Sequence, residues 1–151
     1  MNKEDLRIGF IGAGYMGYGI AHNLIKNDIS LSVIAHKNRK PIDRLVSEGA
    51  IELNTFKELS DFSNVIIICV TNTPVAIEVI NELLPHIKES TILIDITTHH
   101  ATGSIEVNNL LKSKKISYIE SPVMGGPVQA EQGVLGAIVG ATKNDFEQTK
   151  D

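Results

Sequence analysis

The chain has 151 residues, of which 42% are hydrophobic and 21% charged, and its formal net charge is −4. This length suits a single globular domain, and the weak acidic balance gives no support for a nucleic-acid partner or an anionic membrane surface. No apolar stretch is long enough to span a membrane, and the one cysteine, Cys69, has no partner for an internal disulfide. We therefore expect a cytoplasmic protein.

Short β-rich runs alternate with helix-like segments along the chain. The expected strands are Leu6–Ile11, Leu31–Ala35, Val65–Val70, Thr91–Ile96 and Ile116–Ile119, with a minor strand from Ile51 and a last strand at Val134–Val139. The expected helices are Tyr15–Asn27, Pro41–Glu48, Pro74–Leu84 and Thr102–Lys112, with a short one over Phe56 and Leu59 that Asn54 or Thr55 caps. This alternation predicts an α/β fold with a mainly parallel sheet and helices on both faces.

A glycine-rich turn, Gly12-Ala13-Gly14-Tyr15-Met16-Gly17, lies directly after the first strand and directly before the first helix. In this context Gly12 permits the tight turn, Gly14 lets the backbone approach a pyrophosphate, and Gly17 lets the helix pack on the sheet. The free N–H groups of the helix N-terminus then face the phosphates. The six residues predict a dinucleotide site in a doubly wound, Rossmann-type fold, rather than an ordinary structural turn.

The end of the second strand bears on the choice of cofactor. An acid at this position bonds the ribose of NAD, whereas a basic group accommodates the 2′-phosphate of NADP. The sequence has no acid there and reads His36-Lys37-Asn38-Arg39-Lys40. We expect Lys37 and Arg39 to be the chief contacts of a 2′-phosphate, with His36 or Asn38 as hydrogen-bond donors. The alternative is a solvated loop with ordinary surface charge.

Two further loops follow central strands, where ligands bind in open α/β sheets. Val70 and Thr71 begin one loop, and Thr97 and Thr98 belong to the other. The hydroxyls of Thr71, Thr97 and Thr98 could bond the nicotinamide ribose or amide, or could cap the next helices. As a set on one edge they favour a cofactor role. The pair His99-His100 has no evident acidic or cysteine partner, so we expect no metal site.

Several spaced motifs resemble the β-hydroxyacid dehydrogenases, a family that includes 3-hydroxyisobutyrate dehydrogenase, tartronate semialdehyde reductase and the glyoxylate/succinic semialdehyde reductases. The motifs are the run from Gly9 to Gly17, Ala21-His22-Asn23-Leu24, Glu48-Gly49-Ala50, Asp95-Ile96-Thr97-Thr98, and Glu120-Ser121-Pro122-Val123-Met124-Gly125-Gly126-Pro127 with Ala130-Glu131 and Gly133 behind it. The resemblance spans essentially the whole chain, and members of the family are considerably longer.

The resemblance implies an oxidoreductase that moves hydride between a nicotinamide cofactor and a short 3-hydroxy acid or its semialdehyde. The expected cofactor is NADP, with NAD possible. The segment from Glu120 resembles the family's substrate loop, so Met124, Gly125 and Gly126 are the expected contacts of a small carboxylate substrate. Met124 stands where the family commonly has serine or threonine, and a thioether accepts only weakly, so one polar substrate contact is lost or replaced.

The resemblance also implies that residues 1–151 form one NAD(P)-binding domain. The family's catalytic lysine, its all-helical second domain and its usual homodimer contacts would lie beyond Asp151, where a helix starting near Asn144 has barely begun. No catalytic residue is therefore assigned, and we expect little activity from this chain alone. Two alternatives stay open: a free-standing dinucleotide-binding module without catalysis, and an imine reductase-like enzyme, which Met124 keeps in consideration.

Overall fold

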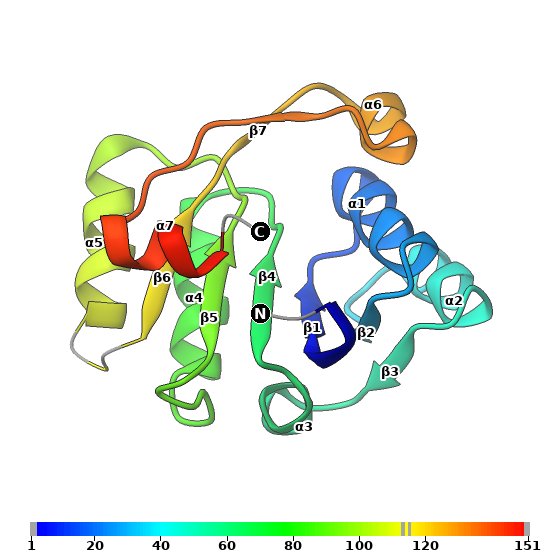
Figure 1. Cartoon of the computed structure of the whole chain (residues 1–151), viewed down its shortest axis with the longest axis horizontal. Coiled ribbons are helices and arrows are strands. Elements are labelled where there is room, and N and C mark those ends of the chain that lie inside the picture. Colours follow the sequence, from blue (N-terminus) through cyan, green and yellow to red (C-terminus); the bar gives the residue numbers. More distant parts are fainter. Residues whose placement is uncertain (1–2, 113, 115, 150–151) are drawn as a thin grey trace.

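A six-stranded parallel sheet forms the centre of the computed structural model, which describes residues 3–112, 114 and 116–149 (Figure 1). Its strand order is β3-β2-β1-β4-β5-β6. The strands are β1 (Arg7–Ile11), β2 (Ser30–Ile34), β3 (Ile51–Leu53), β4 (Val65–Ile68), β5 (Ile92–Asp95) and β6 (Ser117–Glu120). This arrangement confirms the predicted doubly wound α/β fold.

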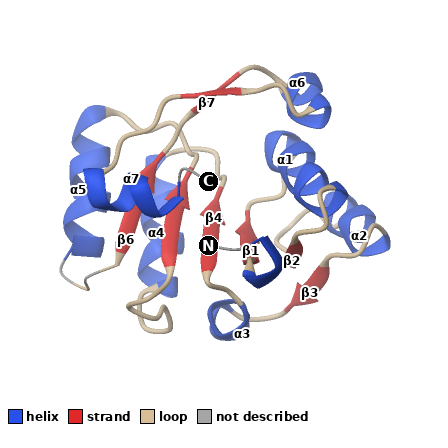
Figure 2. Cartoon of the chain, in the orientation of Figure 1, coloured by secondary structure: helices blue, strands red, loops and turns tan. Residues whose placement is uncertain are grey.

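Helices cover both faces of the sheet (Figure 2). On one face lie α1 (Tyr15–Lys26) and α2 (Lys40–Ser47), and on the other lie α3 (Phe56–Phe62), α4 (Thr73–Leu83) and α5 (Ala101–Lys112). The all-apolar strand β4 shows why two layers are needed: Val65 and Ile67 join the core under α1 and α2, whereas Ile66 and Ile68 join the core under α3, α4 and α5. Successive side chains of a strand point to opposite faces, so a strand without polar alternation must be covered twice.

The strand order places β1 between β2 and β4. The chain leaves β1 for α1 on one face and leaves β4 for α4 on the other. A crevice at the carboxyl ends of the strands forms where the winding direction changes in this way, and ligands of open α/β sheets bind there. The glycine turn follows β1, so the fold brings the predicted dinucleotide residues to this point.

The segment of residues 121–142, called the strap below, leaves the main sheet and crosses above the strand ends toward α1 (Figure 1). It contains β7 (Val123–Met124), α6 (Pro127–Gln132) and β8 (Gly136–Ala137), and β7 and β8 pair antiparallel as a separate two-stranded sheet. The prediction of a strand over Val134–Val139 was wrong in extent, because only two residues pair. Val134, Ile138 and Val139 are exposed, so their apolar character does not reflect burial in a sheet.

Two short elements complete the described chain. A 3-10 turn, η1 (Lys3–Asp5), precedes β1, and α7 (Lys143–Thr149) corresponds to the helix expected from Asn144. Lys150 and Asp151, which were expected to continue that helix, lie outside the described residues. No helix in the described ranges has the length and apolar character that a membrane crossing requires.

Candidate functional site

The turn between β1 and α1 is closed tightly by its glycines. Gly12 has a φ of +97°, and an added Cβ there would lie 2.0 Å from the carbonyl oxygen of Cys69. A Cβ at Gly17 would lie 2.2 Å from the carbonyl oxygen of Gly12. Real side chains cannot occupy either space, so these two glycines are required by the folded chain itself.

Gly14 differs from the other two glycines of the turn. A Cβ built on Gly14 would meet no atom within 4 Å, and its φ of −77° is open to any residue. It is the N-cap of α1 and supplies no side-chain cap, so the first N–H groups of the helix face outward without one. Tyr15, the first residue of the helix, is 89% exposed. The space beside Gly14 is therefore suited to an anionic ligand that approaches the backbone closely.

The basic loop after β2 is exposed, but its arginine is not free. Arg39 donates from Nη1 to Oε1 of Glu52 and from Nη2 to Oε2 of Glu52, both at 2.9 Å, and from Nη2 to Oδ1 of Asp43 at 3.0 Å. The hydrogen bond to Glu52, followed by that to Asp43, raises the pKa of Arg39. The same contact with Arg39 lowers the pKa of Glu52. Sequence reasoning missed this arrangement.

The other residues of the loop form fewer contacts within the chain than Arg39 does. His36 and Lys37 are exposed, and Lys37 forms no ion pair with any described residue. Asn38 accepts a hydrogen bond from the backbone N–H of Lys40 through Oδ1, at 3.3 Å. The run from His36 to Lys40 thus presents two lysines without an ion pair among the described residues, one paired arginine and two other polar side chains at the carboxyl end of β2.

The loops after β4 and β5 are tied to each other by Thr97. Its Oγ1 accepts a hydrogen bond from the N–H of Val70 at 3.2 Å, and its side chain is buried. Thr71 and Thr98 are exposed. Capping of α4 belongs to Asn72, whose Oδ1 accepts from the N–H of Val75. The predicted residues thus meet at one edge, and Thr71 and Thr98 are its exposed threonines.

The expectation that His99 has no acidic partner was wrong. Its Nε2 lies 2.8 Å from Oδ2 of Asp95, its Nδ1 lies 3.0 Å from Oγ1 of Thr73, and the side chains of His99 and Asp95 are fully buried. Oδ1 of Asp95 also accepts from the N–H of Thr97 at 2.9 Å. This buried network joins the end of β5 to the start of α4 and holds the Thr97 loop in place.

His100 and Cys69 at this edge are a helix cap and a protonated thiol. The ring Nδ1 of His100 accepts from the N–H of Gly103 at 3.0 Å, so this histidine caps the start of α5. Burial, with a smaller contribution from the charge of Asp95, raises the pKa of the Cys69 thiol to about 11. Such a thiol stays protonated at neutral pH and is a poor nucleophile. Among the described residues, no three His, Cys, Asp or Glu side chains gather as metal ligands.

The predicted substrate residues lie at the start of the strap. Met124 is 55% exposed and pairs with Gly136. Gly125 has a φ of +133°, a conformation that favours glycine. The N–H of Gly126 donates to Oε1 of Gln129 at 3.0 Å, so a ligand that used this N–H would have to displace the Gln129 side chain.

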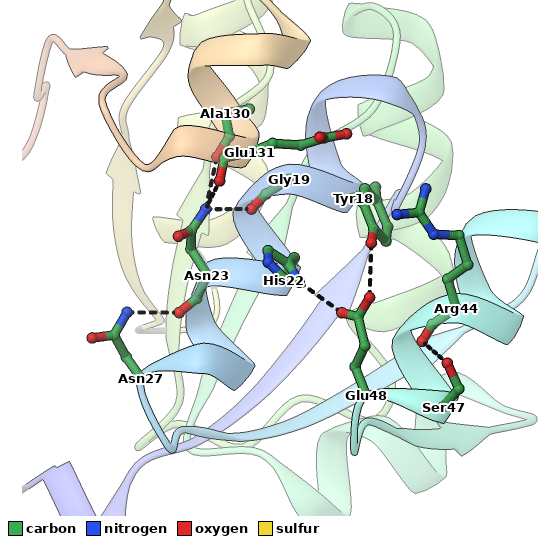
Figure 3. A network of polar contacts seen from close by, with 10 residues as sticks. All are labelled: Tyr18, Gly19, His22, Asn23, Asn27, Arg44, Ser47, Glu48, Ala130 and Glu131. Atoms are coloured by element: carbon green, nitrogen blue, oxygen red, sulfur yellow. Dashed lines mark hydrogen bonds and ion pairs between the residues drawn. The ribbon is translucent and has the colours of Figure 1, made fainter.

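The strap is anchored on α1 by a residue that sequence reasoning did not single out for this role (Figure 3). Nδ2 of Asn23 donates to the carbonyl oxygens of Gly19 and Ala130, both at 2.8 Å, and of Glu131 at 3.1 Å. Close approach depends on Gly19, because a Cβ there would lie 2.6 Å from the backbone nitrogen of Glu131. Helix α1 therefore begins at the glycine turn and holds the strap with its middle.

Two hollows in the surface of the described chain do not coincide with this edge. Their volumes are about 450 and 460 Å³. The first is lined by Ile34, Asn54, Thr55, Phe56, Lys57, Glu82 and His86, and the second by Thr102, Ile105, Glu106, Asn109 and Leu110. None of the residues predicted to bind cofactor or substrate lines either one. The candidate site is thus an open edge made of backbone and loops.

Comparison with known families and proteins agrees with this geometry. The family described as the NAD binding domain of 6-phosphogluconate dehydrogenase matches residues 7–151. An uncharacterised oxidoreductase of Bacillus subtilis, YkwC, is 32% identical over 93% of this chain and 49% of its own length. A probable mitochondrial 3-hydroxyisobutyrate dehydrogenase of Dictyostelium discoideum is 31% identical over 95% of this chain and 45% of its own length.

A solved structure described as Mycobacterium tuberculosis 3-hydroxyisobutyrate dehydrogenase with L-serine has a TM-score of 0.90 and 21% identity, over 96% of this chain and 50% of its own. At this identity the likeness shows the fold. The chain spans about half the length of the curated relatives it matches. The names of the relatives confirm the resemblance inferred from the spaced motifs.

Proposed function

The chain belongs to the family of the NAD binding domain of 6-phosphogluconate dehydrogenase, and we propose that it is the cofactor-binding part of an NADP-preferring hydroxyacid dehydrogenase or semialdehyde reductase. The observation that carries this proposal is the glycine turn at the point where the winding of the sheet reverses. Gly12 and Gly17 close the turn, and the space beside Gly14 is open. A pyrophosphate in that space would meet the N-terminus of α1.

The preference for NADP is supported by the loop after β2. It has no carboxylate of its own to bond a ribose 2′-hydroxyl, and it carries Lys37 and Arg39. Charge-assisted hydrogen bonds from these side chains would recognise a 2′-phosphate. Val70, Thr71, Thr97 and Thr98 would then line the nicotinamide end, with the exposed hydroxyls of Thr71 and Thr98 as its hydrogen-bonding groups.

On the substrate side, the proposal assigns a short carboxylate to the start of the strap. Gly125 offers its backbone N–H group, and Gly126 offers its own once the Gln129 side chain is displaced. Met124 offers an apolar surface at a position where the β-hydroxyacid dehydrogenases commonly have a hydroxyl. The rest of the substrate site, the general acid–base group and the homodimer contacts are proposed to belong to a helical domain of the full-length protein. Residues 1–151 would then form its NAD(P)-binding domain.

The division of labour in the reaction follows from these assignments. The reduced nicotinamide, when bound, supplies the hydride. Residues of the glycine turn would hold the pyrophosphate, and the loop after β2 would set which dinucleotide binds. The buried Asp95–His99–Thr73 network would hold the Thr97 loop in position at the end of β5. The strap would fix the carboxylate so that the reacting carbon faces the nicotinamide.

Calorimetric titration of the chain with NADPH and NADH tests the proposal. Two charge-assisted contacts of about 1.5–3 kcal/mol each predict that NADPH binds at least about tenfold more tightly than NADH. The double variant Lys37→Ala/Arg39→Ala should lose most of this preference and leave NADH binding nearly unchanged. A control that removes two lysines elsewhere, Lys26→Ala/Lys88→Ala, should keep it. Equal affinity for the two cofactors, or tighter binding of NADH, would contradict the proposed preference.

A further inference from the structure

The guanidinium of Arg39 is held by two carboxylates. Glu52 takes one N–H from each terminal nitrogen, and Asp43 takes a second N–H from Nη2. Three of the five N–H donors that an arginine has are therefore used inside the chain. The fork formed by Nη1 and Nη2, which would bind a phosphate in bidentate fashion, faces Glu52 instead.

The two carboxylates reach Arg39 from different elements. Asp43 lies one turn along α2 from Arg39, which is the N-cap of that helix. Glu52 lies in β3, opposite Val33 of β2 in the parallel register. Strand pairing therefore places an acid beside the loop proposed to read the cofactor, although that loop contains none. The charge of Arg39 is outweighed locally by these two anions, and Lys37 and Lys40 are left as cations without an ion pair among the described residues.

We propose that Glu52 competes with the 2′-phosphate of NADP for Arg39 and thereby sets how strongly the chain prefers NADP over NAD. This inference rests on the proposed function, because it takes the loop after β2 as the site that reads the cofactor. Binding of the 2′-phosphate would exchange one anionic partner of Arg39 for another. Exchange is accessible because the Arg39 side chain is 55% exposed and that of Glu52 is 27% exposed, and exposed ion pairs are weak.

The isosteric variant Glu52→Gln provides the test. It removes the competing charge and keeps the shape of the side chain, so NADPH should bind about three- to fivefold more tightly, as loss of a weak exposed ion pair allows. Affinity for NADH should stay the same. The variant Asp61→Asn is the matched control, because it changes the net charge equally and its carboxylate pairs with Lys57 and Lys88 instead of Arg39. Asp43→Asn should give a smaller gain than Glu52→Gln.

A double-mutant cycle assigns the effect to Arg39. In an Arg39→Ala background, Glu52→Gln should no longer change NADPH affinity beyond what Asp61→Asn does. Circular dichroism and thermal melting of each variant establish that the fold is unchanged, which the position of Glu52 on the edge strand β3 favours. Titrations at low and high salt add a second readout, since the gain from Glu52→Gln should shrink as salt screens exposed charges.

Three results would overturn the inference. If Glu52→Gln raises NADPH affinity no more than Asp61→Asn does, Glu52 does not compete for Arg39. Weaker NADPH binding would mean that Glu52 holds Arg39 ready for the phosphate, and weaker NADH binding would mean that Glu52 bonds the ribose directly. The proposed function fails separately, if the wild-type chain binds NADH at least as tightly as NADPH. A clear NADPH preference that Glu52→Gln does not alter leaves that function standing and removes only the competition.

Discussion

At the scale of single residues, the glycines of the turn have separable roles. The positive φ of Gly12 and the short distance from its missing Cβ to the Cys69 carbonyl make it a requirement of folding. Gly14 has ordinary backbone angles and empty space beside it. Gly12 is thus required by the fold, whereas the lack of a side chain at Gly14 matters chiefly to a ligand that would fill the space beside it.

Substitutions at the two positions should therefore have opposite signatures. We expect Gly14→Val to stay folded, at a cost of no more than about 1 kcal/mol for an apolar N-cap. It should bind NADPH about a hundredfold or more weakly, since its side chain fills the space for the pyrophosphate. Gly12→Ala should lose at least about 2 kcal/mol of unfolding free energy, because strain and overlap act together. Urea titration and calorimetry measure both effects. A Gly14→Val variant with normal NADPH binding would remove the glycine turn from the site.

The same scale shows what sequence could and could not predict about the site. The turn was predictable because its requirements are local to residues 12–17. The pairing of Arg39 with Glu52 was not, because it depends on the register of β2 and β3. The contact of Asp95 with His99 was also missed: a spacing of four residues predicts contact in a helix, whereas here it arises where the chain leaves a strand.

At the scale of elements, a polar network joins α1 to α2 (Figure 3). Tyr18 donates its hydroxyl to Oε1 of Glu48 at 2.8 Å, Nδ1 of His22 lies 2.8 Å from Oε2 of Glu48, and the guanidinium of Arg44 lies 4.1 Å from the centre of the Tyr18 ring. Burial by itself raises the pKa of Glu48, but the hydrogen bonds of His22 and Tyr18 and the charges of His22 and Arg44 bring it below its usual value of 4.5. The ionised carboxylate is therefore the form that joins the two helices.

This lowered pKa makes the junction of α1 and α2 sensitive to acid. A carboxyl group with a lower pKa in the folded state stabilises the fold above its unfolded pKa, and the stabilisation is lost as pH falls through the folded pKa. Glu48→Gln should cost about 1–2 kcal/mol at pH 7, and its difference from wild type should shrink as pH falls below 4.5. Urea unfolding over this range measures the difference. The control Glu106→Gln, on an exposed part of α5, should show none, and a pH-independent cost for Glu48→Gln would rule out the carboxylate's charge as its cause.

Most elements could be predicted because their apolar patterns are local. The strands of the main sheet lie inside the predicted ranges or within one residue of them, since runs such as Val65–Ile68 are covered on both faces. The expected strand at Val134–Val139 was overestimated. Its apolar residues are exposed on the strap, and an apolar run by itself does not say whether a sheet will receive it.

At the scale of the whole molecule, the strap connects the two halves of the sheet. At one end Glu120 of β6 and Gly140 exchange two backbone hydrogen bonds of 2.9 and 2.7 Å, and the N–H of Ser121 donates to the carbonyl oxygen of Asp95. At the other end Asn23 holds Ala130 from a distance of 107 residues in sequence. A separation of this size explains why sequence patterns could not reveal the anchor, which only the folded chain creates.

Replacing Asn23 by Asp should detach the far end of the strap. The change removes the two amide N–H donors and turns a carboxylate toward the carbonyl oxygens of Ala130 and Glu131, at a cost of about 1–3 kcal/mol. Amide hydrogen exchange in α6 and β7 should then become about tenfold faster or more, with the main sheet unaffected. Asn27→Asp is the matched control, because the amide of Asn27 donates to Asn23 and not to the strap. Unchanged exchange in α6 would show that packing against Gly19 suffices as the anchor.

The different roles of the three turn glycines also determine which of them would be replaced during evolution if the domain lost its ligand. Selection for a stable fold maintains Gly12 and Gly17, since neither position has room for a side chain. At Gly14 a side chain has room, so selection for a bound dinucleotide acts there together with the milder preference of a helix N-cap for glycine over apolar residues. A descendant that kept the domain as a scaffold and lost its ligand would therefore keep the first and third glycines and drift at the second. A replacement at position 14, with glycines kept at positions 12 and 17, would thus indicate that a descendant no longer binds the ligand.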